Sequence, residues 1–138
     1  MIVDSSALVA IHEAEPERAA FVAAIRAAAT RRMSAATYVE CGIVLDRRPS
    51  THGSSRLDDL LTSLDIAVVP LTVEQARAAR RAHTRFGRGS GHPARLNLGD
   101  CLSYALAVTE DEPLLFKGDD FSHTHVRVAI EELAQREE

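Results

Sequence analysis

Short apolar runs alternate along the chain with longer segments whose apolar residues recur every three or four positions. The run at 1–3 (MIV) predicts a buried strand, and further strands are expected at 65–71 (DIAVVPL), at 113–117 (PLLFK) and, as a short one, at 31–35 (RRMSA). Helical periodicity is expected over residues 6–12, 17–29, 34–45, 56–64, 73–86 and 101–108. A last short strand at 126–130 and a charged helix at 131–138 complete the prediction. Strands separated by helices need crossover connections, so we expect a three-layer α/β/α sandwich with a mainly parallel central sheet.

The composition is typical of one domain that spans residues 1–138. A chain of 138 residues with 46% hydrophobic content can build one well-packed core but is short for two. Cys41 and Cys101 lie in apolar helical patterns without the paired spacing of a zinc site or disulfide framework, so we expect reduced core thiols. No leader and no apolar run of roughly 20 residues is present, which predicts a cytoplasmic protein that does not enter a membrane.

Charge is distributed unevenly. Sixteen basic and twenty acidic side chains give a net charge of -4, which excludes a globally basic nucleic-acid coat protein. Between positions 77 and 95, however, lie six arginines and no acid: Arg77, Arg80, Arg81, Arg85, Arg88 and Arg95. A local basic stripe can bind phosphates on an acidic molecule, because exposed charges are screened beyond about 8–10 Å. A solvated helix face is the alternative interpretation.

Glu40 stands in the middle of an otherwise small and apolar helix. It shares a face with Ala36, Ile43 and Val44, and we expect this face to point inward. A buried carboxylate needs a basic partner, a raised pKa or a metal ion. A salt bridge to a distant arginine stays open beside the metal hypothesis.

The other notable acids each have a purely structural alternative. Asp4 ends the first strand and suits an N-cap, and Asp100 stands three residues after Asn97 as in a capping box. Asp119 and Asp120 follow Gly118 in a turn.

Taken together, these acids indicate a metal site. In a parallel sheet the carboxyl ends of the strands meet at one edge, where ligands collect. Asp4, Glu40 and Asp100 could converge there on a divalent cation, and oxygen-only ligands favour Mg²⁺ or Mn²⁺ over zinc. We expect their carboxyl groups to lie within a few ångströms of one shared point.

The chain resembles the PIN-domain ribonuclease toxins of bacterial VapBC toxin–antitoxin pairs. The resemblance covers essentially the whole chain and is carried by "MIVDSSALVAI", "YVE", "LNLGDCLSYALA" and "PLLFKGDDF", whose order and separations match together. It implies a PIN-like fold and an Mg²⁺-dependent endoribonuclease (Mn²⁺ being a possible substitute) that cleaves structured RNA such as tRNA or rRNA and inhibits translation and growth. It also implies a homodimer and a VapB-type antitoxin that blocks the site, often by presenting an arginine to the acids.

The resemblance assigns roles to individual residues. The family's acids carry over to Asp4, Glu40 and Asp100, and a family hydroxyl beside the first aspartate falls on Ser6. Gly118 occupies the position of the usual fourth acid, so Asp119 is expected to substitute, while Asp120 could hold the turn. The general base is left open between Glu40 and Asp119. The basic stripe would hold the RNA backbone, chiefly through Arg81, Arg85, Arg88 and Arg95. Aromatic content of 4% favours recognition of RNA shape over base stacking.

Two other classes of protein compete with the nuclease. One is a catalytically inert module of the same fold that binds RNA or protein. The other is a receiver-like signalling domain, which would use Lys117 after a late strand. That class also needs an aspartate at the end of a central strand, whereas "IAVVP" ends in Pro70.

Overall fold

The computed structural model describes residues 1–48 and 53–131 and has a four-stranded sheet at its centre. The strands are β1 (Ile2–Val3), β2 (Arg32–Ser34), β3 (Ala67–Val69) and β4 (Leu114–Leu115). They lie in the order β3-β2-β1-β4, and every pairing is parallel. The expected parallel sheet is confirmed.

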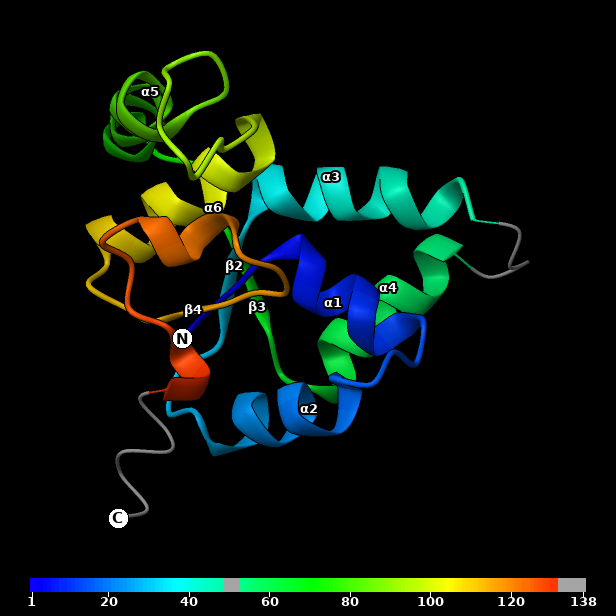
Figure 1. Ribbon diagram of the computed structural model, residues 1–138. Coiled ribbons are helices and arrows are strands. Elements are labelled where there is room, and N and C mark those ends of the chain that lie inside the picture. Colours follow the sequence, from blue (N-terminus) through cyan, green and yellow to red (C-terminus); the bar gives the residue numbers. More distant parts are fainter. Residues whose placement is uncertain (49–52, 132–138) are drawn as a thin grey trace.

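Helices cover both faces of this sheet (Figure 1). On one face lie α1 (Ser5–His12), α2 (Arg18–Ala27), α3 (Ala35–Asp46) and α4 (Gly53–Ser63). On the other lie α5 (Val73–Phe86) and α6 (Leu98–Thr109), and a short 3-10 helix, η1 (Asp120–His123), follows β4. The predicted three-layer α/β/α sandwich is therefore confirmed.

Alternation along the central strands divides the core into two halves. Val3 and Leu115 pack with α1 to α4, whereas Ile2 and Leu114 pack with α5 and α6. All four side chains are buried. A strand buried on both faces is apolar at successive positions, which is why these runs were recognisable in the sequence.

Two details differ from the sequence-based prediction. The strand expected at 126–130 is reduced to a single bridge between Val128 and Leu114, and residues 132–138 lie outside the described part of the chain. The expectation for α3 was also wrong, because its fully buried residues are Thr37, Cys41 and Leu45 rather than the Glu40 face. Ile43 is 48% exposed. Helix α3 packs mainly on α1 and α4 and also contacts α6, and Glu40 is half-buried at the margin of the core.

The remaining core features agree with expectation. Cys41 and Cys101 are buried free thiols. Within residues 1–48 and 53–131, no helix is long and apolar enough to cross a membrane.

Candidate active site

Three acid-bearing segments meet at the carboxyl edge of the sheet. Asp4 follows β1 directly, Glu40 lies in the second turn of α3, which continues from β2, and Asp100 lies in the first turn of α6. Helices α3 and α6 contact each other, and their first turns lie side by side above the end of β1 (Figure 1). The topology thus brings together acids that are 36 and 60 residues apart in the sequence.

Asp4 is buried and held from both sides. Its side chain is 2% exposed and caps α1. Oδ2 accepts hydrogen bonds from the Ser6 backbone nitrogen at 3.0 Å and from Ser6 Oγ at 2.6 Å, and Oδ1 accepts one from Ser103 Oγ. Donors on both oxygens stabilise the ionised form of a buried carboxylate.

Glu40 faces the same region. Ser5 Oγ donates a hydrogen bond of 2.9 Å to its Oε1. The carboxylate lies so close to Gly99 that a Cβ at position 99 would overlap it. No residue of the described ranges forms an ion pair with Glu40, so these parts of the chain do not supply the distant arginine considered above.

Asp100 has both the capping role and an unusual electrostatic environment. Its backbone nitrogen donates to Asn97 Oδ1 at 2.8 Å, and the Asn97 nitrogen donates to Asp100 Oδ2 at 3.0 Å. The pKa of Asp100 is raised to about 6, chiefly by burial and further by the charges of Asp4, Asp120 and Glu40, against the lowering effect of the Asn97 hydrogen bond. The other acids are therefore close enough to oppose the ionisation of Asp100.

These residues suit a hard divalent cation by their chemistry. Carboxylate and hydroxyl oxygens gather here, and a cation would relieve the repulsion that helps to raise the pKa of Asp100. The expected convergence on one point is not met, since the described residues contain no group of three His, Cys, Asp or Glu side chains already arranged as a metal site. Glu40 is instead turned toward Ser5, and Asp100 toward Asn97.

The turn after β4 carries two further acids, Asp119 and Asp120. Asp120 begins η1, and its charge acts on Asp100. Asp119 is exposed and lies just before η1. Of these two acids, only Asp120 is among the charges that raise the pKa of Asp100, together with Asp4 and Glu40.

Basic side chains border the site along α5. Arg77, Arg80 and Arg81 line one surface depression, and Arg80 also lines a second one whose floor includes Leu98 of α6. The Arg85 guanidinium lies 4.9 Å from the centre of the Phe86 ring. Arg88 and Arg95 are exposed in the loop that leads to α6. None of the six arginines forms an ion pair with another described residue.

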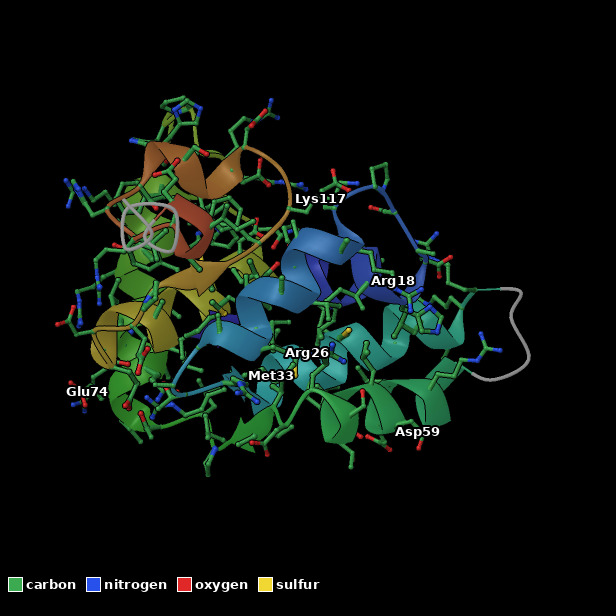
Figure 2. All side chains as sticks on the ribbon, turned by 90° about the horizontal axis from the view of Figure 1, so that it is seen from below. Arg18, Arg26, Met33, Asp59, Glu74 and Lys117 are labelled. Carbon is green, nitrogen blue, oxygen red and sulfur yellow. The ribbon has the colours of Figure 1, made fainter. Side chains whose placement is uncertain are left out.

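Lys117 is engaged elsewhere. Its ammonium group pairs with Glu15 and with Glu17, the latter at 3.2 Å, in the segment that leads into α2 (Figure 2). The strand order also differs from the 2-1-3 arrangement of receiver domains. Both observations contradict the receiver-like interpretation.

Sequence reasoning missed four residues that contact the acids directly or through a neighbouring hydroxyl: Ser5, Thr37, Gly99 and Ser103. Thr37 and Ser103 carried a weak signal, since each is a hydroxyl residue three positions from an acid, on the buried face of an apolar helix. Gly99 had none, because its role depends on a side chain from another helix.

Comparison with known proteins identifies the family. A model of the PIN domain matches residues 1–126. Ribonuclease VapC28 of Mycobacterium tuberculosis is 54% identical over 131 residues, covering 95% of this chain and 98% of that protein. Ribonuclease VapC42 of the same species is 49% identical over 129 residues, covering 94% and 98%.

Solved structures agree with the fold. The crystal structure of M. tuberculosis VapC20, described as a Sarcin-Ricin loop cleaving toxin, superposes with a TM-score of 0.70 at 19% identity, covering 92% of this chain and 97% of that one. A chain of a toxin-antitoxin complex from Klebsiella pneumoniae gives 0.65 at 16% identity, covering 88% and 89%. With these relatives matched over nearly their full length, the chain belongs to the PIN-domain family of VapC ribonucleases, the endoribonuclease toxins of type II toxin–antitoxin systems.

Proposed function

We propose that this protein hydrolyses phosphodiester bonds of a structured RNA, with Mg²⁺ held by Asp4, Glu40 and Asp100. The observation that carries the proposal is the effect of the neighbouring acids on Asp100: its pKa is raised to about 6, chiefly by burial, and the charges of Asp4, Asp120 and Glu40 raise it further. Mn²⁺ has the same preference for oxygen ligands and should substitute. The turn after β4 adds Asp119 or Asp120 as the fourth acid, and the electrostatic effect on Asp100 favours Asp120.

Each residue has a defined task in this proposal. Asp4 is fixed by Ser6 and Ser103, and presents the oxygen lone pairs that those donors leave free. Glu40 is the more mobile ligand, since it accepts a hydrogen bond from Ser5 alone among the described residues. Glu40 or Asp119 takes up the proton of the attacking water. When bound, a divalent cation supplies a water of lowered pKa and positive charge for the phosphate oxygens.

The α5 arginines bind the RNA backbone. Arg77, Arg80 and Arg81 carry charge that no described residue neutralises, and the depression that Arg80 shares with Leu98 leads to the first turn of α6, where Asp100 lies. A strand of RNA held there by its phosphates would pass the acids. Arg85, at the end of α5, and Arg88 and Arg95, in the loop before α6, are exposed and would add to this binding. The RNA is a tRNA or rRNA, whose cleavage stops translation in the cytoplasm.

Two protein partners complete the proposal. A VapB-type antitoxin blocks the acids with an arginine, whose positively charged guanidinium group would bind the carboxylates in place of the metal ion. The toxin itself forms a homodimer. Exposed apolar side chains on α3 support a protein contact there, because Val39 is 57% and Ile43 is 48% exposed, and they flank Glu40.

Cleavage of RNA by the purified protein tests this function. Incubation with total RNA and Mg²⁺, followed by mapping of the new ends, should give cuts at defined positions that EDTA abolishes and added Mn²⁺ restores. Asp4→Asn and Asp100→Asn should remove the cuts, while Asp59→Asn, an exposed acid on α4 (Figure 2), should leave them unchanged. Cleavage that persists in EDTA, or in both site variants, would contradict the proposal.

A further inference from the structure

Two hydroxyl groups that carry no charge and face no solvent connect all three acid-bearing segments. Ser103 of α6 and Thr37 of α3 are 1% and 0% exposed. Ser103 Oγ donates to Asp4 Oδ1, and Thr37 Oγ1 lies 3.3 Å from Ser103 Oγ. Thr37 is one turn before Glu40, and Ser103 is one turn after Asp100.

The donors and acceptors of this chain of hydroxyls can be assigned. A serine hydroxyl has one proton, and Ser103 donates it to Asp4 Oδ1. Ser103 must then accept at its own oxygen, so Thr37 is the donor of the second bond. The chain of hydrogen bonds therefore runs from Thr37 through Ser103 to Asp4 Oδ1, and each bond polarises the next.

A second chain of hydrogen bonds reaches the other oxygen of the same carboxylate. The Lys117 backbone nitrogen donates to Ser6 Oγ at 3.0 Å, and Ser6 Oγ donates to Asp4 Oδ2 at 2.6 Å. Asp4 is thus held between α3 and α6 on one side and the end of β4 on the other. A carboxylate held at both oxygens cannot rotate about its Cβ–Cγ bond without breaking one of these hydrogen bonds.

We propose that Ser103 and Thr37 are positioning residues for the metal site, which fix the plane of the Asp4 carboxylate and the spacing between the helices that carry Glu40 and Asp100. This inference rests on the proposed metal-dependent function. Residues that orient a ligand carboxylate through a hydrogen bond commonly change metal affinity by about 10- to 100-fold when removed. Neither Ser103 nor Thr37 needs to touch the metal or the RNA for this effect.

The test is direct binding of Mn²⁺ to the purified chain, measured from the EPR signal of the free ion, without RNA or turnover. Ser103→Ala should weaken binding by about 10- to 100-fold. Thr37→Val keeps the shape but removes the hydroxyl, so it should weaken binding by a smaller factor, whereas Thr37→Ser keeps the hydroxyl and should bind as the wild type does. Because Thr37 acts through Ser103, Thr37→Val should add nothing when Ser103 is already alanine.

Thr109→Val is the matched control. Thr109 is also on α6, and its hydroxyl bonds to backbone carbonyls of its own helix, those of Ala105 and Leu106. The Thr109→Val variant should therefore bind Mn²⁺ with the affinity of the wild type.

Two results would overturn the inference. Unchanged Mn²⁺ affinity in Ser103→Ala and Thr37→Val, with or without a lower unfolding temperature, would show that the hydroxyls merely join helices. If Ser103→Ala does not fold, the comparison of Thr37→Val with Thr37→Ser decides alone. If the wild type binds Mn²⁺ no better than Asp4→Asn does, the proposed metal-dependent function fails as well. This result therefore distinguishes failure of the proposed function from failure of the positioning role alone.

Discussion

Among the residues around the site, Gly99 is the one at which any side chain would collide with an acid of the site. The Glu40 carboxylate occupies the space where a side chain at position 99 would begin. Glycine is costly within a helix, by about 1 kcal/mol relative to alanine, and Gly99 lies in the first turn of α6. The close approach of Glu40 explains why a glycine is found there.

Gly99→Ala should therefore separate stability from activity. The new methyl group displaces the flexible end of Glu40, while the helix gains up to about 1 kcal/mol from alanine. We expect an unchanged or slightly higher unfolding temperature and a loss of RNA cleavage of about 100-fold, the effect of a misplaced catalytic group. Gly42→Ala is the control, because a Cβ there meets only Leu57 at an ordinary 3.9 Å. Full activity of Gly99→Ala would show that RNA cleavage does not depend on the space that Gly99 leaves for the Glu40 carboxylate.

The pH dependence of stability should report the environment of Asp100. Its folded pKa of about 6 lies above the ordinary aspartate value of 3.8, so between these values the native state binds a proton that the unfolded state has lost. The free energy of unfolding therefore falls as pH rises through this window, and below pH 4 the penalty is absent.

Asp100→Asn removes this penalty, and its amide oxygen can still accept from the Asn97 nitrogen. In EDTA, we expect the variant to unfold at a higher temperature than the wild type above pH 6, with the difference vanishing toward pH 4. Thermal unfolding between pH 4 and 8 measures it, and Asp59→Asn provides an exposed control. If the wild type is more stable than Asp100→Asn at pH 8 without metal, the result would argue against a raised pKa of Asp100 in the folded protein.

At the scale of single residues, the sequence revealed the acids but not their contacts. Asp4, Glu40 and Asp100 were selected by type and by their place after a strand or on a helix, and the caps of Asp4 and Asn97 were also predicted. The bond between Ser103 and Asp4 joins positions 99 residues apart, and no local pattern encodes it.

At the scale of elements, the start of helix α5 can be predicted from neighbouring residues alone. Thr72 and Gln75 stand three positions apart in the sequence, the spacing of a capping box, and both of its hydrogen bonds are present. Helix α3 shows the opposite, because an apolar helix has no contrast between its faces, and the elements packed against it, chiefly α1, α4 and α6, decide which face is buried.

Charge reversal on α5 tests the role of that helix. Arg81→Glu combined with Arg85→Glu should weaken RNA binding and make it less dependent on salt. The slope of the logarithm of the binding constant against the logarithm of the salt concentration should become shallower by about 0.7–0.9 for each phosphate that is no longer neutralised. The control reverses two exposed arginines of α2, Arg18 and Arg26, which lie on the opposite face of the sheet (Figure 2). Equal weakening in both double variants would indicate a general effect of net charge rather than a binding stripe.

The molecule as a whole follows from alternation of strands and helices. That pattern predicted a parallel sheet between two helical layers, and the rule that ligands collect at the carboxyl edge located the acids. The strand order β3-β2-β1-β4 could not be predicted from the sequence. The alternation of strands and helices shows that crossovers are needed, but it does not show which strands become neighbours in the sheet.

Association of two copies is expected to involve α3. Val39→Lys combined with Ile43→Lys would place charge on the two exposed apolar positions beside Glu40 and should convert a dimer to a monomer of 15.0 kDa in light scattering. Val108→Lys, at an exposed apolar position of α6, should leave the dimer intact. A dimer that survives both lysines on α3 would place the interface elsewhere.

Anomalous diffraction from crystals soaked with Mn²⁺ tests the central claim most directly. Asp4, Glu40 and Asp100 are predicted to close around a bound cation, with Glu40 and Asp100 turning from Ser5 and Asn97. The expected result is an anomalous peak within coordinating distance of carboxylate oxygens from all three residues. A protein that cleaves RNA but shows Mn²⁺ only at sites remote from Asp4 would contradict the account.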